Sequence, residues 1–207
     1  LGDVYKRQEQ MSRIATLFDI NQLNNRNLAA FTKLKELQEA DGAWSWYKGM
    51  SGNRYITTYI TGLLVRLPLL TKKELPADAS GLVQNAFGYL HKMALDEYHT
   101  IREAEKKGAK ITTVSDAIME YLYLIAISGE KVPAANQTAY RYFLSKLNGN
   151  LANGTMTCKA QTAIILQKAG RKAEADEFIA SIKEHLVQTD EMGAHFAFYP
   201  DTVSYTH

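Results

Sequence analysis

One cysteine and one glutamine have the spacing of a thioester pair. Cys158 and Gln161 are three residues apart in the segment Cys-Lys-Ala-Gln. A helix would place both side chains on one edge, where a thiol and a side-chain carbonyl could close a small ring. A cysteine is also among the most frequently buried residue types and often fills a helix face. We therefore predict a structural role for both residues.

The histidines do not form a metal-binding pattern. His91 and His99 lie about two helical turns apart, which is too far to chelate one ion without further ligands. We expect both to be solvated or to cap helices. His185 follows Glu184 near a predicted helix C-terminus, where a partly charged imidazole is favourable. We expect no metal site and no cofactor.

Several carboxylates occur in groups that lack a catalytic partner, and we interpret them as surface charge. They are Asp96, Glu97, Glu174, Asp176 and Glu177. The sequence also contains no Gly-x-Ser-x-Gly segment, phosphate loop or His-Glu-x-x-His segment. These observations predict that the chain is not an enzyme.

The most specific pattern is a turn of the form Gln-x-x-Asp-Gly-x-Trp between two apolar-periodic segments. Gly42 can adopt a positive φ angle, Asp41 favours turns, and Trp44 is large enough to plug the helix layer below. Helical toroids join their helix pairs through turns of this kind. We predict structural roles for the four residues that define it, which are Gln38, Asp41, Gly42 and Trp44.

The loop after this turn is rich in aromatic residues, and two interpretations remain open. In the first, Trp44 and Trp46 plug the end of the toroid, while Arg54 pairs with a loop carboxylate or carbonyl. In the second, the loop is an interface, because Trp, Tyr and Arg are typical hot-spot residues. The candidate interaction residues are Trp44, Trp46, Tyr47, Arg54 and Tyr55.

Composition limits the class of protein. The 207 residues suit one domain or most of one, and the 46% hydrophobic content is enough for a core. The net charge of +2 is too small for nucleic-acid binding, and one cysteine cannot build a disulfide framework. No apolar run is long enough to span a membrane. The scarcity of alternating apolar and polar residues favours an all-α fold.

Apolar residues at three- and four-residue steps predict about eight helices. The predicted ranges are 9–19, 21–39, 55–67, 79–107, 113–127, 133–147, 155–169 and 172–187. Pro68 should end the third helix, Gly108 should cap the fourth, and a capping box over Thr113–Asp116 should open the fifth. An irregular or extended segment is expected over 195–199. Sequential antiparallel pairs without an internal repeat predict a partial α/α toroid.

Both ends of the chain look foreign to the rest. Residues 1–8 match a translation of a transposon-end sequencing adapter, and residues 203–207 match its reverse complement. We therefore expect the native domain to cover residues 9–202 and to be part of a longer protein. Leaving out Asp3, Lys6 and Arg7 lowers the net charge from +2 to +1.

Eight segments follow one another in an order typical of one family. They are Arg13–Asn21, Leu34–Gln38, Asp41–Trp46, Gly49–Thr57, Ala160–Leu166, Gly170–Ala175, Ser181–His185 and Glu191–Gly193. In this order they resemble the helical thioester-domain region of large bacterial alpha-2-macroglobulin-like proteins. The resemblance covers nearly all of residues 9–199, and its N-terminal part is the more specific.

The resemblance implies a fold, a function and a location. In this family the region is an α/α toroid within a chain several times longer, and the whole protein is a protease trap. This chain would then be a non-catalytic domain of an endopeptidase inhibitor in the periplasm or cell envelope. Its partners would be other domains of the same chain, with proteases as targets of the whole protein. The resemblance implies no nucleic-acid or membrane contact for this segment.

The resemblance also bears on the thioester. The family motif is Cys-x-Glu-Gln and precedes the Gln-x-x-Asp-Gly-x-Trp turn. Here Ala160 replaces the glutamate, and Cys158 follows the turn. A reactive motif, where the parent protein has one, is therefore expected before Glu9.

The alternative is an enzyme of another toroid family. Terpene cyclases need an Asp-rich motif and tend to repeat the Gln-Trp turn, which occurs once here. Protein prenyltransferases need an Asp, Cys and His zinc set. A polysaccharide-processing toroid would need paired carboxylates facing an aromatic-lined cleft. Trp44 and Trp46 could supply the aromatic rings, but no acid pair is identifiable.

Overall fold

Helices make up most of the protein in the computed structural model, which describes residues 20–191 and 193–196, together with residue 11. The helices are α2 (Ile20–Leu37), α3 (Arg54–Thr71), α4 (Ala77–Lys106), α5 (Asp116–Ser128), α6 (Gln137–Lys146), α7 (Asn150–Asn153), α8 (Met156–Lys168) and α9 (Lys172–Lys183). Short 3-10 helices, η1 (Ala134–Asn136) and η2 (Leu147–Gly149), flank α6. The predicted all-α class is confirmed at this level. The helix predicted over 9–19, apart from residue 11, and the adapter-like ends lie outside the described residues.

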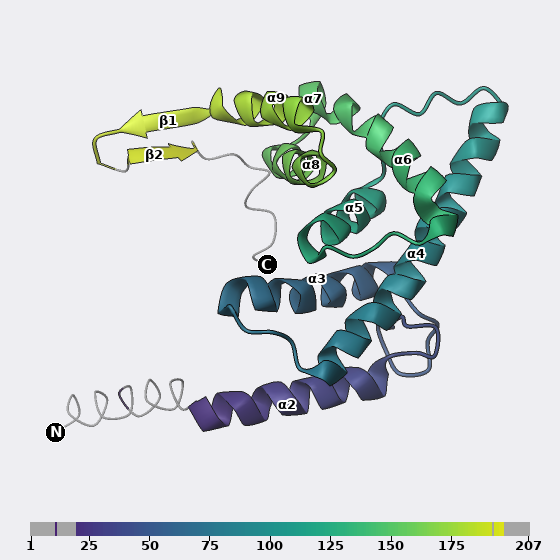
Figure 1. The fold of residues 1–207 in the computed structure, drawn as a ribbon, viewed down its shortest axis with the longest axis vertical. Coiled ribbons are helices and arrows are strands. Elements are labelled where there is room, and N and C mark those ends of the chain that lie inside the picture. Colours follow the sequence, from purple (N-terminus) through teal and green to yellow (C-terminus); the bar gives the residue numbers. More distant parts are fainter. Residues whose placement is uncertain (1–10, 12–19, 192, 197–207) are drawn as a thin grey trace.

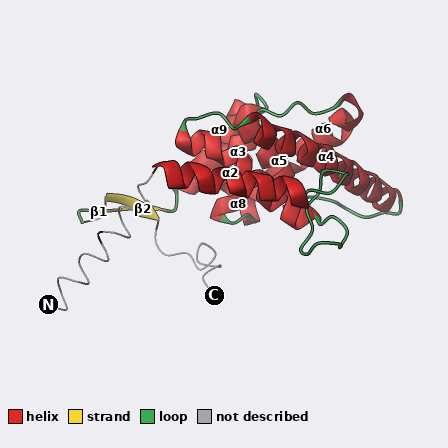
Figure 2. Ribbon diagram, turned by 90° about the horizontal axis from the view of Figure 1, so that it is seen from below, coloured by secondary structure: helices red, strands yellow, loops and turns green. Residues whose placement is uncertain are grey.

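The chain also forms one small antiparallel hairpin. Strand β1 (Leu186–Thr189) pairs with β2 (Gly193–Phe196), and Leu186 lies opposite Phe196. The hairpin projects away from the helices (Figures 1 and 2). The prediction that the last helix reaches residue 187 was therefore wrong. The extended segment expected from residue 195 is confirmed for 195–196, and residues 197–199 are not described.

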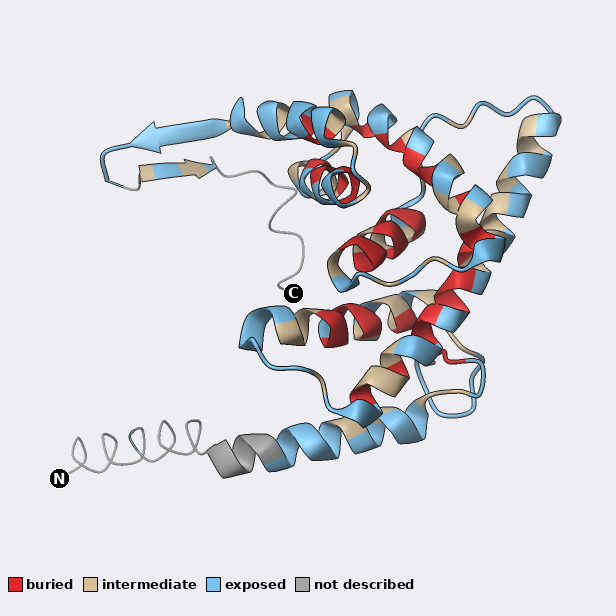
Figure 3. Ribbon diagram, viewed as in Figure 1, coloured by how far each residue is buried: buried red, intermediate tan, exposed pale blue. Residues whose placement is uncertain are grey.

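Several helices pack on helices that do not follow them directly in the chain. Helix α5 packs between α3 and α8, and these three follow one another across the molecule in Figure 1. Helix α4 packs on α2 and α3 and contacts α6, while α9 packs on α8, which precedes it across the tight turn at Gly170. Buried residues concentrate on the sides of the helices that face one another, as Figure 3 shows.

Two apolar clusters form the core. The larger cluster joins α4, α5, α6, α8 and α9, and its fully buried members include Phe87, Tyr121, Phe143, Ile165 and Phe178. The smaller cluster lies between α2, α3, α4 and the turn that precedes α3. Its buried residues are Trp44, Leu64, Leu82 and Ala86, with Phe31 and Leu34 of α2 packed against them. The smaller cluster therefore fixes the turn on the helical body.

Two predicted helix boundaries were wrong for local reasons. Helix α3 continues past Pro68 to Thr71, because a proline in the last turn removes only one intrahelical hydrogen bond. Helix α5 is capped by Ser115, whose Oγ accepts from the N–H of Ile118 at 3.2 Å, rather than by a box starting at residue 113. The glycine after α4 was correctly predicted, since Gly108 has φ +96°.

Candidate functional site

The Gln38–Trp44 turn is a rigid structural element held against α4. Gly42 has φ +89°, and a Cβ atom at this position would lie 2.0 Å from the carbonyl oxygen of Asn85. Gln38 Nε2 donates to the carbonyl oxygens of Gly42 and Leu82 at 3.0 and 2.9 Å. Only glycine can combine this close approach with a positive φ angle. The sequence therefore correctly identified the residues that shape the turn.

Asp41 and Trp44 complete the turn. Asp41 Oδ1 accepts from the N–H of Ala43 at 3.1 Å, which closes a local Asx turn. Trp44 is 1% exposed, and its Nε1 donates to the Leu34 carbonyl oxygen at 2.9 Å. The Trp44 N–H donates to Thr57 Oγ1 at 2.9 Å, so one residue links α2, the turn and α3. Trp44 is a packing residue, as the first interpretation predicted.

Trp46 does not have that role. Its side chain is 55% exposed, and its ring stacks on that of Tyr55 with a centroid separation of 6.1 Å and an interplanar angle of 14°. Tyr47 and Tyr55 are 75% and 65% exposed. The interpretation that Trp46 plugs the fold was therefore wrong, since Trp44 is the ring that lies in the smaller buried cluster. Three of the candidate interaction residues are instead presented to solvent.

Exposed apolar side chains continue from this loop along α3. Tyr59 and Leu63 follow Tyr55 at steps of four residues, so all three lie on one face of the helix, and each is about half exposed or more. The inward face of α3 carries smaller residues, including Thr57, Thr61, Gly62 and Val65. We call the set Trp46, Tyr55, Tyr59 and Leu63 the aromatic surface. A contiguous exposed apolar patch on a protein surface often marks an interaction site.

Arg54 belongs to a partly buried ionic network rather than to the aromatic surface. Its Nη1 pairs with Glu97 of α4, whose other oxygen accepts from Ser115 Oγ at 2.6 Å. The network therefore joins the first residue of α3, the middle of α4 and the cap of α5. The expected partner in the loop was wrong, since the ion pair is made to a helix. Glu97 is thereby explained as a structural carboxylate.

The remaining carboxylates of the predicted surface groups differ in their contacts. Glu174 pairs with Arg171 and accepts from Asn148, and these hydrogen bonds, the one from Arg171 first, hold the pKa of its carboxyl below the usual range. Asp176 and Glu177 are exposed, as predicted.

Cys158 and Gln161 occupy one helix but are engaged separately. Cys158 is half-buried at the start of α8, and burial raises the pKa of its thiol. Gln161 Nε2 donates to the carboxylate of Glu120 on α5. A raised pKa disfavours the thiolate that nucleophilic chemistry needs. The geometry fits the structural role predicted for this pair.

The two histidines of α4 have different environments. His99 is exposed, as expected for a solvated residue, but His91 is 6% exposed and forms no cap. Its Nδ1 lies 2.7 Å from the Tyr121 hydroxyl, and its Nε2 lies 3.7 Å from Glu130 Oε1. This burial was not predicted, because the contact residues come from segments distant in the sequence. Within the part of the chain that the structure describes, no group of three or more His, Cys, Asp or Glu could hold a metal ion.

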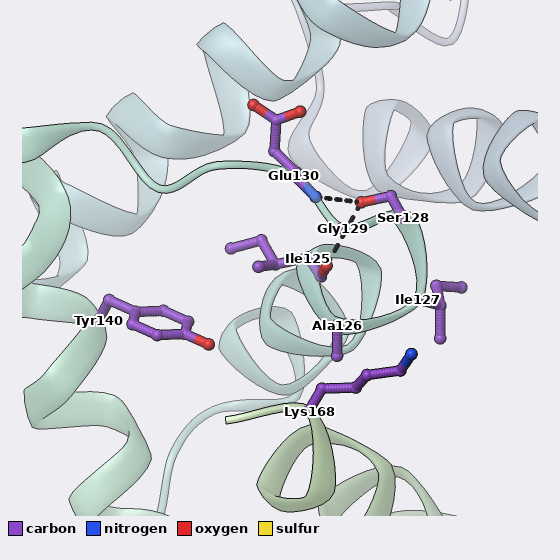
Figure 4. A pocket seen from close by; sticks show the side chains of 8 residues that line it. All are labelled: Ile125, Ala126, Ile127, Ser128, Gly129, Glu130, Tyr140 and Lys168. Atoms are coloured by element: carbon purple, nitrogen blue, oxygen red, sulfur yellow. Dashed lines mark hydrogen bonds between the residues drawn. The ribbon is translucent and has the colours of Figure 1, made fainter. Parts of the chain in front are cut away.

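One shallow pocket lies at the end of α5. It has a volume of about 370 Å³ and is shown in Figure 4. Its lining comes from Ile125–Glu130, Tyr140 of α6 and Lys168 of α8. The Tyr140 ring faces the end of α5 across the hollow. The polar groups here come from three elements, which is why the sequence did not identify the pocket.

The described chain is thus an all-α domain with a buried turn that supports an exposed aromatic surface. None of its described helices is long and apolar enough to cross a membrane. No family model, curated protein sequence or solved structure matches the chain. The functional assignment therefore depends on the geometry of the surface and on the sequence resemblance.

Proposed function

We propose that this chain is a non-catalytic interaction domain of a larger alpha-2-macroglobulin-like protease trap. The observation that carries the proposal is the aromatic surface. Trp46 and Tyr55 expose more than half of their side chains, although both are attached to a rigid turn and helix. Large, rigid aromatic side chains on a fixed scaffold are typical of binding hot spots. Under this proposal the surface docks on another domain of the same long chain.

The helix arrangement supports the finer part of the proposal, a partial α/α toroid. Such a fold places alternate helices in an inner and an outer layer. The contacts of α5 with both α3 and α8, and of α2 with α4, are those that this arrangement requires. The turn before α3 then supports one end of the inner layer. The family resemblance adds an expected location in the periplasm or cell envelope.

The experiment uses the full-length parent protein. The parent is mixed with an endopeptidase, and cleavage of a large protein substrate is compared with cleavage of a small peptide. A trap should protect the large substrate and leave the small one accessible, because the captured protease keeps a free active site. Equal cleavage of both substrates, with and without the parent, would count decisively against the proposal.

Variants of the parent test the role of the aromatic surface. The double variant Trp46→Ala/Tyr55→Ala should lose protection of the large substrate while the domain still folds, since both side chains are exposed. Leu28→Ala on α2 is the matched control, because Leu28 is also exposed but lies outside the aromatic surface. Equal protection by the double variant and the control would remove the aromatic surface from the mechanism.

A further inference from the structure

His91 is a buried titratable residue at a junction of four elements. It lies in the middle of α4, where its ring contacts Tyr121 of α5 edge-on and Phe87 one turn earlier. Its backbone carbonyl oxygen accepts from Asn136 Nδ2 of η1 at 2.7 Å. Glu130, in the loop that connects α5 to η1, lies beside its Nε2. A change in the charge of His91 therefore alters its electrostatic interactions with all four elements, which are α4, α5, η1 and the loop between α5 and η1.

The contacts determine where the neutral ring carries its proton. Burial raises the pKa of the Tyr121 hydroxyl far above its usual value, so this group keeps its proton and can donate to Nδ1 at 2.7 Å. Nδ1 is then the acceptor, and Nε2 carries the hydrogen. Nε2 is buried and has no hydrogen-bond partner among the described residues. A buried N–H without an acceptor is unfavourable, and the penalty is larger once the ring is charged.

Glu130 can supply that acceptor. Its Oε1 lies 3.7 Å from Nε2, slightly too far for a hydrogen bond, and its side chain is 30% exposed. The preceding Gly129 ends α5 with φ +73° and has open space around it. At the η1 end of the loop, Asn136 is hydrogen-bonded to the His91 carbonyl oxygen. At the α5 end, Glu130 approaches the His91 ring without forming a hydrogen bond. A shift of about 0.9 Å would bring Glu130 into ordinary hydrogen-bond distance.

The other ionisable groups near His91 do not compete for it. Tyr140 of α6 lies near Tyr121, and burial raises the pKa of its hydroxyl, so it remains neutral. Arg54 of α3 is the cation that acts on Tyr121, and it is already paired with Glu97. Glu130 is thus the one carboxylate that faces the imidazole among the described residues in this cluster.

We propose that His91 and Glu130 form a proton-operated latch: on protonation, His91 draws the Glu130 carboxylate into a direct hydrogen bond and fixes the α5–α6 loop on α4. While the ring is uncharged, its N–H can form only a weaker, neutral-donor hydrogen bond, and the latch is open. When the ring gains a proton, a charge-assisted hydrogen bond to the Glu130 carboxylate forms. The latch does not depend on the proposed trap function.

Burial lowers the pKa of His91, and the nearby Glu130 carboxylate partly offsets this effect. The latch therefore closes below the ordinary histidine pKa of about 6.5.

The test follows the His91 ring by NMR from pH 7.5 to 4.5 and measures hydrogen-exchange protection factors of residues 129–133. Protection should rise roughly tenfold on acidification, the lower end for a hydrogen bond to a charged group. Glu130→Gln keeps the size of the side chain but removes its charge, and should abolish the rise and lower the His91 pKa. His99→Gln, at an exposed position, should leave the rise unchanged.

Several results would overturn the latch. Protection that stays constant or decreases as His91 titrates would show that the protonated ring does not bind the loop. An unchanged pH response in Glu130→Gln would assign the effect to another group. A His91 ring that stays neutral until the chain unfolds would also exclude the latch. Glu130 lies in a loop and is partly exposed, so its variant should fold.

Discussion

Replacing Gly42 with alanine should destabilise the domain far more than the same change at Gly49. Both glycines belong to the segment between α2 and α3 and have nearly identical φ angles, +89° and +90°. They differ in their surroundings. A Cβ atom at residue 42 would lie 2.0 Å from Asn85 O, whereas one at residue 49 would meet nothing within 4 Å.

The expected magnitudes follow from this difference. At Gly49 the only cost is the left-handed backbone, about 1–2 kcal/mol for a residue with a Cβ atom. At Gly42 the turn must also move about 1.4 Å from α4 to restore an ordinary contact of 3.4 Å. That movement breaks the Gln38–Leu82 hydrogen bond, worth about 1 kcal/mol, and adds about 1–3 kcal/mol of packing strain. We expect a total loss of about 3–6 kcal/mol for Gly42→Ala.

Urea denaturation followed by far-UV circular dichroism measures both losses directly. The midpoint should fall in both variants, with a difference in unfolding free energy of at least about 2 kcal/mol between them. In thermal melts that difference corresponds to about 4–8 °C for a domain of this size. Equal losses in the two variants would refute the claim that close approach to α4, rather than backbone conformation alone, requires glycine at residue 42.

Three further predictions concern other parts of the fold. Trp44→Phe should lower the unfolding free energy by about 2–3 kcal/mol in urea melts, because the Leu34 carbonyl oxygen loses the hydrogen bond from the indole. Trp46→Phe at the exposed position should change it by less than about 0.5 kcal/mol. Similar losses for both variants would contradict the different burial of the two rings. The unfolding free energy should decrease as pH falls from about 6.5 toward the lowered folded-state pKa of His91, since the unfolded chain binds the proton more readily, and His91→Gln should reduce this slope. Cys158 should react with a disulfide reagent at pH 7.5 more slowly than free cysteine and should approach the free rate in urea, because burial raises the pKa of its thiol; rapid reaction of the folded chain would refute this.

The boundaries of the elements show where local patterns are sufficient. The periodic apolar residues of α4 and α5 predicted those helices within a few residues, because each stripe faces a core that follows directly from its spacing. The end of α3 and the cap of α5 were misplaced, because several nearby residues could serve as cap or stop. The hairpin was missed because its β1 residues are exposed on both faces and carry no alternating pattern.

Burial of single residues in the candidate site was harder to predict. Trp44 and Trp46 are two positions apart and chemically identical, yet one is 1% and the other 55% exposed. Trp44 packs in the cluster between α2, α3 and α4, whereas Trp46 stacks on the exposed Tyr55 ring. His91 and Arg54 were likewise misjudged, since Glu130 and Glu97 reach them from elements 39 and 43 residues away.

The sequence by itself determined the helical class, the turn at Gly42 and the absence of a local catalytic motif, because these depend on spacing and on the conformational limits of single residue types. Tertiary structure alone decided which aromatic rings face solvent, which carboxylate pairs with Arg54 and where an unpaired histidine nitrogen meets a carboxylate. These features depend on distances between segments remote in the chain, and such distances are set only when the helices pack together.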